Sequence, residues 1–124
     1  MNVILFALFL HFLGDFFLQP REMAMKKSSQ WGALIGHCTI IWLTMIPLAV
    51  AAGAIPSEAF MFATLNSIIH GAIDRNIWKR YKIRAERKGT GFHYWNDYIY
   101  FLVIGFDQFL HASTMFLLLW WVVG

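Results

Sequence analysis

The sequence predicts an all-α membrane protein, a bundle of four transmembrane helices. The composition supports this class, because 59% of the 124 residues are hydrophobic and only 14% are charged, whereas soluble domains carry about 25% charged residues. The apolar residues also form long runs, and runs of about 20 such residues are typical of spanning helices. Four runs occur, at residues 2–19, 31–54, 59–78 and 97–123. We expect them to form one domain, residues 1–124.

The first run, MNVILFALFLHFLGDFFLQP, is interpreted as a retained helix. A secretory signal peptide has basic residues at its start and an unbroken apolar core. Here no Lys or Arg precedes Arg21, and His11 and Asp15 interrupt the apolar core. We therefore expect this run to remain part of the membrane bundle.

The basic residues predict the orientation of the four runs. All ten Lys and Arg lie either just after the first run, at 21–27, or around and after the end of the third run, at 75–88. The connection at 51–60 contains none. Because Lys and Arg are enriched in cytoplasmic loops, we expect both basic segments in the cytoplasm. Both termini would then lie on the periplasmic side of a bacterial inner membrane.

The basic stretch RNIWKRYKIRAERKG, at 75–89, is interpreted as a solvated loop attracted to anionic lipid head groups. It lacks the domain context expected of a nucleic-acid-binding protein. We therefore expect the lipid bilayer as a partner and no nucleic acid. A bundle this small is also compatible with a homo-oligomer.

Each apolar run contains polar residues that are not expected to face lipid. In three of the runs they lie four residues apart, which places them on one face of a helix. A charged residue at the centre of a bilayer costs about 2.5–3.5 kcal/mol, so these faces should point into the bundle. The residues are His11, Asp15 and Gln19; His37; Asn66, His70 and Asp74; and Asp107, Gln108 and His111.

The His and Asp residues of these stripes are predicted to lie at similar depths. At about 1.5 Å per residue, most lie about 6–14 Å from the cytoplasmic end of their run, and His111 about 20 Å. Small residues beside them predict close helix contacts. These residues are Gly14, Gly36, Gly71 and Gly105, with Gly32 and Gly36 in a GxxxG spacing. The four helices should therefore converge on one site in the cytoplasmic half of the membrane.

Four His and three Asp match the ligands of a divalent transition metal, with Zn²⁺ preferred and Mn or Fe as alternatives. The core ligands are expected to be His11, His70 and His111. Asp74 would be a carboxylate ligand and His37 the next candidate. Because seven groups exceed the needs of one tetrahedral ion, either two ions bind or some carboxylates orient the histidines.

The remaining polar residues of the stripes are given supporting roles. Asp15 or Asp107 would act as the general base. The amides of Gln19, Asn66 and Gln108 would orient ligands or contact substrate. His93 is excluded from the site, because it belongs to the loop or membrane interface. Asp97 is predicted to be an N-cap of the last helix or close to one.

The site predicts a metal-dependent hydrolase acting on a lipid-linked or membrane-partitioned substrate, since a bound metal lowers the pKa of water to about 7. A small transporter or channel is the main alternative, because His and Asp chains also pass ions, protons or solutes. A non-catalytic phage or host membrane protein that acts on a partner is the third class.

Several ordered motifs resemble a known family. They are HFLGDFFLQ with a following Lys pair, a lone His early in the second run, HGAID followed by Lys79, and DQFLH in the last run. These resemble the small phage and bacterial membrane proteins grouped as domain of unknown function 3307. The resemblance covers nearly the whole chain. It implies signature positions at His11, Asp15, Gln19, His37, His70, Asp74, Asp107, Gln108 and His111.

The resemblance implies no particular activity. Lys79 lies five residues after Asp74 and is not placed in the site. The HxxxD pattern is also loosely similar to bacterial inner-membrane proteins described as metal-dependent hydrolases, which favours the hydrolase hypothesis by analogy.

Overall fold

The computed structural model describes residues 2–89 and 91–124, and every regular element within them is a helix. The predicted all-α class is therefore confirmed. The elements are α1 (Val3–Phe12), the π-helical turn η1 (Leu13–Phe17), α2 (Arg21–Lys26), α3 (Trp31–Ala51), α4 (Pro56–Glu86), the 3-10 turn η2 (Tyr94–Asn96) and α5 (Tyr98–Val123).

Two connections expected as loops are partly helical. The basic segment after the third apolar run continues α4 as far as Glu86, and α2 lies between the first and second runs. Both segments are rich in Lys, Arg, Glu, Met and Ala, which have high helix propensity. The length of an apolar run is therefore shorter than the helix that contains it wherever the helix continues with charged residues.

Two helices, α3 and α5, are long and apolar enough to cross a membrane. The apolar helix at Val3–Phe17 is shorter. At about 1.5 Å per residue it is about 22 Å long, against a hydrocarbon core of about 30 Å. The α4 helix is apolar in its first half, but many charged residues follow in its second half. The four-span arrangement stays a prediction.

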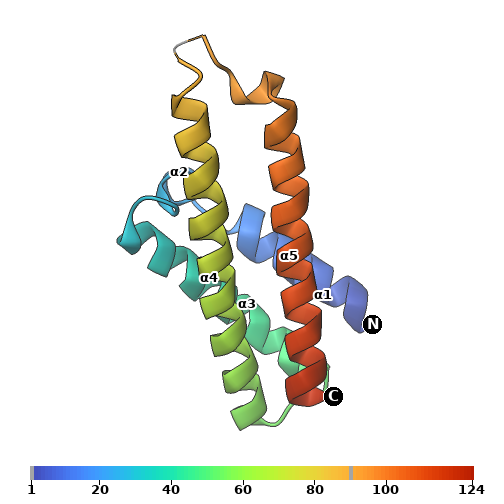
Figure 1. Cartoon of the computed structure of the whole chain (residues 1–124). Coiled ribbons are helices and arrows are strands. Elements are labelled where there is room, and N and C mark those ends of the chain that lie inside the picture. Colours follow the sequence, from blue (N-terminus) through green and yellow to red (C-terminus); the bar gives the residue numbers. More distant parts are fainter. Residues whose placement is uncertain (1, 90) are drawn as a thin grey trace.

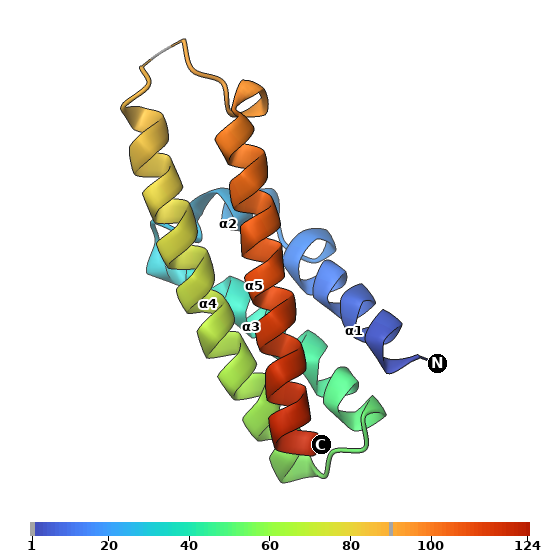
Figure 2. The same ribbon diagram turned by 45° about the vertical axis from the view of Figure 1, so that its right-hand side comes forward.

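The α4 and α5 helices form a long antiparallel hairpin, which α1 and α3 cross obliquely (Figure 1). Figure 2 shows the same crossing from a second direction. The connection between α4 and α5 lies at one end of the molecule, and the C-terminus and the α3–α4 connection lie at the other (Figure 1).

The helix starts are set by side-chain caps. The Asn2 side chain accepts a hydrogen bond from the backbone N–H of Ile4. Before α4, the N–H of Ile55 donates to the Glu58 carboxylate at 3.0 Å, and Pro56 occupies the first helical position, where its missing N–H costs nothing. The Asp97 carboxylate accepts from the N–H of Ile99 at 3.2 Å, which confirms the predicted N-cap.

The apolar core lies towards the end of the bundle that holds the α3–α4 connection. Its fully buried side chains include Ile41, Met45, Leu48, Phe62 and Met115, from α3, α4 and α5. Burying each such side chain contributes about 1.5–3 kcal/mol relative to water. This core fixes the crossing of the helices, and the polar residues of the stripes lie beside it.

Only some of the predicted glycine contacts are found. A Cβ on Gly71 would lie 2.5 Å from the Cys38 sulfur, and a Cβ on Gly14 would lie 2.9 Å from the side chains of Ile41 and Thr44. The predicted close contact is therefore confirmed at these two positions. Gly36 faces the flexible Met23 side chain of α2 instead of a neighbouring backbone.

The prediction is wrong for Gly32 and Gly105, which have no neighbour within 4 Å among the described residues. Sequence spacing alone does not show which side of a helix faces a partner. Among the described residues, Gly36 therefore meets α2 through the Met23 side chain, and Gly32 meets no other helix closely.

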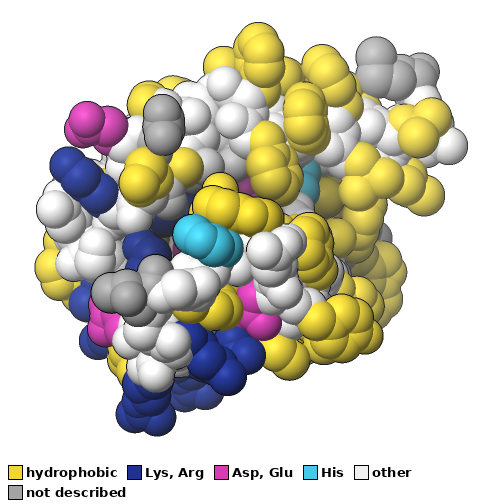
Figure 3. Space-filling model, turned by 90° about the horizontal axis from the view of Figure 1, so that it is seen from above, with side chains coloured by type: hydrophobic (Ala, Val, Ile, Leu, Met, Phe, Trp, Pro, Cys, Tyr) yellow, Lys and Arg dark blue, Asp and Glu magenta, His cyan; other side chains and the backbone are white. Residues whose placement is uncertain are grey.

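The surface separates by residue type. Seen from the end that holds the α4–α5 connection, Lys and Arg gather on one side of the molecule and hydrophobic side chains cover much of the rest (Figure 3). Many large apolar side chains are exposed, among them Leu5, Ile35, Ile68, Phe109 and Trp120. Exposed apolar surface on this scale is typical of a face that contacts membrane or protein.

Candidate metal centre

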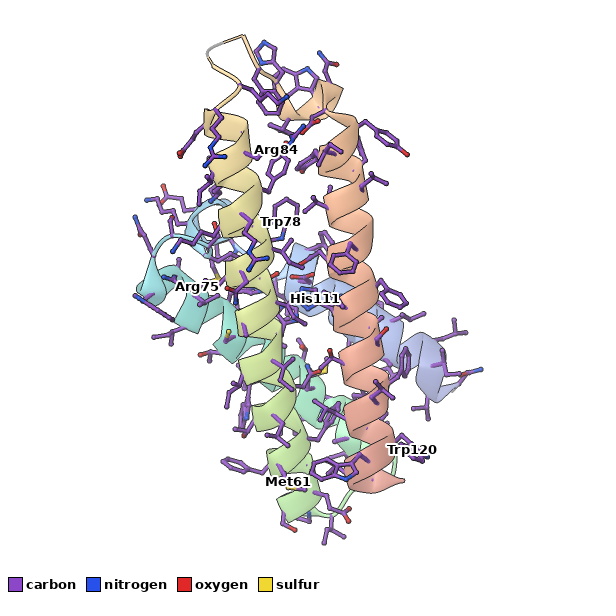
Figure 4. All side chains as sticks on the ribbon, viewed as in Figure 1. Met61, Arg75, Trp78, Arg84, His111 and Trp120 are labelled. Atoms are coloured by element: carbon purple, nitrogen blue, oxygen red, sulfur yellow. The ribbon has the colours of Figure 1, made fainter. Side chains whose placement is uncertain are left out.

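The four histidines predicted for the site lie together at the crossing of α1, α3, α4 and α5. Their ring centroids are separated by 5.9 Å for His11 and His70, 5.0 Å for His37 and His70, and 3.7 Å for the stacked pair His70 and His111. Figure 4 shows His111 partway along α5, between that helix and α4. His93 is exposed, in the connection before α5.

The three predicted aspartates are buried among these rings. None of Asp15, Asp74 and Asp107 is more than 3% exposed. Burying unpaired carboxylates is costly, so buried charges are paired or coordinate metals. The side chains form two groups in which one donor atom per residue lies within 4.8 Å of the others. We call them the four-residue group (Asp15, His37, His70, Asp74) and the three-residue group (Asp15, Asp107, His111).

The four-residue group has the dimensions of a tetrahedral site. The Nε2 atoms of His37 and His70 lie 3.0 Å apart. His37 Nε2 lies 3.2 Å from Asp15 Oδ1 and 3.0 Å from Asp74 Oδ2, and His70 Nε2 lies 3.4 Å and 3.3 Å from the same two atoms. Donors on a tetrahedral ion with bonds of about 2.0–2.1 Å are about 3.3–3.4 Å apart. These donors are therefore spaced for one small ion.

The three-residue group adjoins the first and shares Asp15 with it. His111 Nε2 lies 3.2 Å from Asp107 Oδ1 and 3.1 Å from Asp74 Oδ1. The two Asp74 oxygens therefore face opposite ways, Oδ2 towards His37 and His70 and Oδ1 towards His111. The two groups form one continuous polar centre.

Gln108 links the aspartates of α1 and α5 to His11. Its Nε2 donates to Asp15 Oδ2 at 3.0 Å and to Asp107 Oδ2 at 3.2 Å, and its Oε1 lies 2.9 Å from His11 Nε2. His11 is predicted as a core ligand but belongs to neither group. The structure instead places its ring beside the centre, hydrogen-bonded to the amide that orients Asp15.

The other two predicted amides lie differently. The Gln19 Nε2 donates to the backbone carbonyl of Asp15 at 3.0 Å, so this side chain caps the π-helical turn. Asn66 is 4% exposed, but no hydrogen bond connects its side chain to the described residues of the centre. Neither amide is brought into the two groups.

The π-helical turn helps to position Asp15. The N–H of Leu18 donates to the carbonyl of Leu13, five residues earlier, at 2.7 Å, and such local π turns are frequent at functional sites. The close contact of Gly14 with Ile41 and Thr44 holds the turn against α3. This packing brings a carboxylate of α1 to the histidines of α3 and α4.

Lys27 is the residue of the centre that sequence reasoning missed. Its ammonium lies 3.0 Å from Asp74 Oδ2 and 3.5 Å from Asp15 Oδ1, and the residue is 9% exposed. Burial disfavours its charged form, but Asp74 and Asp15 outweigh this effect and raise the pKa of Lys27 above its ordinary value. The sequence predicts Lys27 only as a base of a cytoplasmic loop. The signal for its role was three buried carboxylates that required a cation.

The centre carries a negative charge that its own residues do not balance. Three carboxylates contribute −3 and Lys27 contributes +1, which leaves −2 when the four histidines are neutral. Asp15 Oδ1 and Asp74 Oδ2 share the single Lys27 ammonium, and Asp107 Oδ1 lies 3.2 Å from His111 Nε2. Buried charges are paired or coordinate metals. One divalent cation would balance the remaining charge.

Comparison with known proteins gives a family. Residues 3–124 match the family described as Protein of unknown function (DUF3307). No curated protein and no solved structure matches the chain, so the similarity to metal-dependent hydrolases stays a hypothesis. Because the match covers nearly the whole chain, this protein belongs to the DUF3307 family.

Proposed function

We propose that the protein binds one divalent transition metal ion, preferably Zn²⁺, in the four-residue group. The observation that carries this proposal is the spacing of the His37 and His70 Nε2 atoms, which lie 3.0–3.4 Å from each other and from one oxygen each of Asp15 and Asp74, as around a tetrahedral ion. The charge of the centre supports one divalent ion over two. Asp15 and Asp74 would then be ligands together with His37 and His70.

We further propose that the centre hydrolyses a lipid-linked or membrane-partitioned substrate. A bound divalent metal supplies Lewis acidity and lowers the pKa of a bound water to about 7. Asp107 lies 3.2 Å from His111, and in this proposal the pair would take up a proton beside the four-residue group. Lys27, held charged by two carboxylates, would stabilise negative charge that develops on the substrate.

Metal binding is tested by elemental analysis of the detergent-purified protein. We expect about one equivalent of metal in the wild type and in His93→Ala, whose histidine is exposed and outside the centre. We expect loss of the metal in His37→Ala and in His70→Ala. Absence of metal from wild-type protein purified without chelators, with metal added back, would contradict the proposal.

Hydrolysis is tested separately with Asp107→Asn. Asp107 lies outside the four-residue group, so this variant should keep its metal and lose turnover of lipid esters, amides or phosphates. Retained metal with no turnover of any of these substrates by the wild type would reject the hydrolase role. A flux through proteoliposomes that depends on a membrane gradient and is lost in His70→Ala would instead support a transporter.

For the membrane, we propose that α1, α3, α4 and α5 all cross the inner membrane of a bacterium. The basic segments at 21–27 and 75–88, which we call the basic end, would then lie in the cytoplasm. The placement of all Lys and Arg in the segments 21–27 and 75–88, with none in the connection at 51–60, supports this orientation. The short α1 would require local thinning of the bilayer. In a Cys38→Ala background, Gly89→Cys should react with a membrane-impermeant thiol reagent only after the cells are permeabilised. Labelling in intact cells would reverse the orientation. A phage origin rests on the family resemblance.

A further inference from the structure

A second feature lies on the opposite side of the α3–α4 contact from the metal centre. It is a cleft of about 590 Å³ between these helices, lined on α3 by Trp31, Leu34, Ile35, Cys38, Thr39 and Trp42. The α4 side is formed by Thr64, Ser67, Ile68, Gly71, Ala72, Arg75 and Asn76. Its size is in the range of ligand-binding pockets. Cys38 and Gly71, which follow His37 and His70 in the chain, belong to this lining.

The inner part of the cleft presents an apolar wall, because its polar groups are hydrogen-bonded within the protein. The Ser67 hydroxyl donates to the Cys38 carbonyl at 2.6 Å. The Trp42 indole N–H donates to the Thr64 hydroxyl at 3.1 Å. Ile35 and Ile68 line the same wall and are more than 60% exposed. This part of the cleft suits a hydrocarbon chain.

The opposite end of the cleft carries the Arg75 cation, which has no ion-pair partner among the described residues. The Arg75 guanidinium stacks on the Trp31 ring, with Cζ 3.9 Å from the ring centroid, which holds its plane in one orientation. Arg75 Nη1 is buried, donates no hydrogen bond to the described residues, and Arg75 forms no ion pair with them. Figure 4 shows Arg75 and His111 on different sides of α4. The guanidinium therefore lacks a partner within the described part of the chain.

The order of these features along the cleft matches a lipid. Trp31 begins α3 next to the basic end of the protein, and Trp42 lies eleven residues further along α3, about 16 Å into the proposed membrane. Arg recognises phosphate through paired N–H donors. We propose that the cleft binds one phospholipid, with its phosphate on Arg75 and an acyl chain along Leu34, Cys38 and Ile68. This lipid would hold α3 against α4 behind His37 and His70, and the inference is independent of the proposed hydrolysis.

The test is native mass spectrometry of delipidated protein with phosphatidylglycerol or with diacylglycerol of the same chains. We expect one phosphatidylglycerol to bind about tenfold more tightly than diacylglycerol, since a charge-assisted hydrogen bond supplies the difference. Arg75→Gln should abolish this preference, and Arg80→Gln, which removes an exposed charge of the same helix, should retain it. Ala72→Trp should fill the cleft and weaken the binding of both lipids.

Three outcomes would overturn the proposal. An unchanged preference in Arg75→Gln would place the phosphate elsewhere. Equal binding of the two lipids by the wild type would indicate only a nonspecific lipid shell. Displacement of phosphatidylglycerol by glycerol phosphate, which has no acyl chains, would indicate a site for a soluble anion. The melting temperature of each variant without added lipid checks that its fold is preserved.

Discussion

The Nε2 atoms of His37 and His70 face each other at 3.0 Å, although the residues are 33 positions apart in the chain. Two carboxylate oxygens, Asp15 Oδ1 and Asp74 Oδ2, lie within 3.4 Å of both nitrogens. Each of these four atoms can present a lone pair, so at these distances they repel one another unless protons or a cation lie between them. The stability of the bundle should therefore depend on what occupies this point.

Removal of the metal should destabilise the wild-type protein. A ligand that binds only the folded state at 1,000 times its Kd adds about 4 kcal/mol of stability. We expect EDTA to lower the melting temperature of the wild type and added Zn²⁺ to restore it. His37→Ala, which lacks one donor, should melt at the same temperature with and without EDTA. An equal EDTA response in both proteins would place the metal elsewhere.

Substitution of Lys27 should separate metal binding from stability. Lys27→Met removes the cation beside Asp74, and loss of one partner of a buried pair costs about 3–5 kcal/mol. We expect the metal-free variant to melt well below the wild type. The same change makes the centre more negative, so the increase in melting temperature on adding Zn²⁺ should be larger in the variant.

Lys26→Met is the matched control for Lys27→Met. Lys26 is exposed and forms an ion pair with the exposed Glu22, and such surface pairs are worth about 1 kcal/mol or less. This variant should resemble the wild type with and without metal. Equal effects of the two substitutions would show that Lys27 acts only through the net charge of the protein and not through its ion pairs with Asp15 and Asp74.

The Asp97 ion pair should give the fold a dependence on low pH. Desolvation disfavours the Asp97 carboxylate, but the Arg84 guanidinium at 2.6 Å and the Tyr81 hydroxyl at 3.0 Å outweigh this effect and lower its pKa. The stabilisation is therefore present above the unfolded pKa of about 3.9 and is lost as the pH falls through the lower, folded pKa. Thermal melts between about pH 6 and pH 3 measure this loss.

Asp97→Asn isolates the charge from the cap, because Asn is also a good N-cap. The difference in melting temperature between wild type and variant should be largest near neutral pH and shrink towards pH 3. Arg84→Gln should show the same pattern. A difference that does not change with pH would assign Asp97 a capping role alone.

The contact between Gly71 and Cys38 should control the spacing of α3 and α4. A Cβ on Gly71 would lie 2.5 Å from the Cys38 sulfur, so Gly71→Ala should cost about 1–3 kcal/mol through overpacking. Because His37 and His70 neighbour these residues, metal affinity should fall as well. Cys38→Ala should restore much of both in the double variant, which a double-mutant cycle measures.

Gly105→Ala is the control for this substitution. Gly105 lies within α5 and has no neighbour within 4 Å among the described residues. Replacing a helix-interior Gly by Ala stabilises a helix by up to about 1 kcal/mol. Melting temperatures of the two Gly→Ala variants should therefore move in opposite directions.

The sequence predicted the centre because its residues are conspicuous in an apolar helix. His11, His70 and His111 stand among hydrophobic neighbours, and their four-residue spacing from Asp15, Asp74 and Asp107 requires only helical geometry. The expected cost of facing lipid predicts that all of them point inward. The all-α class and the convergence of four His and three Asp therefore followed from composition and spacing.

The division of these residues into groups depended on packing between helices. The sequence placed His11 among the core ligands and Asp15 outside them, whereas the structure places His11 on Gln108 and puts Asp15 in both groups. Helical spacing gives the face of a residue, but the rotation and crossing angle of each helix decide which atoms meet. The π-helical turn at Leu13–Phe17 adds a local shift that periodicity does not reveal.

By itself, the sequence determined that the chain is helical, strongly apolar and built around buried histidines and aspartates. Only the tertiary structure decided that Lys27 enters the centre, that Gly105 makes no close contact within the described residues, and that a cleft with Arg75 lies behind the histidines. Lys27 follows α2 and Arg75 lies in an apolar-to-basic transition, where local patterns predict only solvent exposure. The environment of both side chains is set by residues far apart in the chain, since Lys27 lies against Asp74 and Arg75 lies against Trp31.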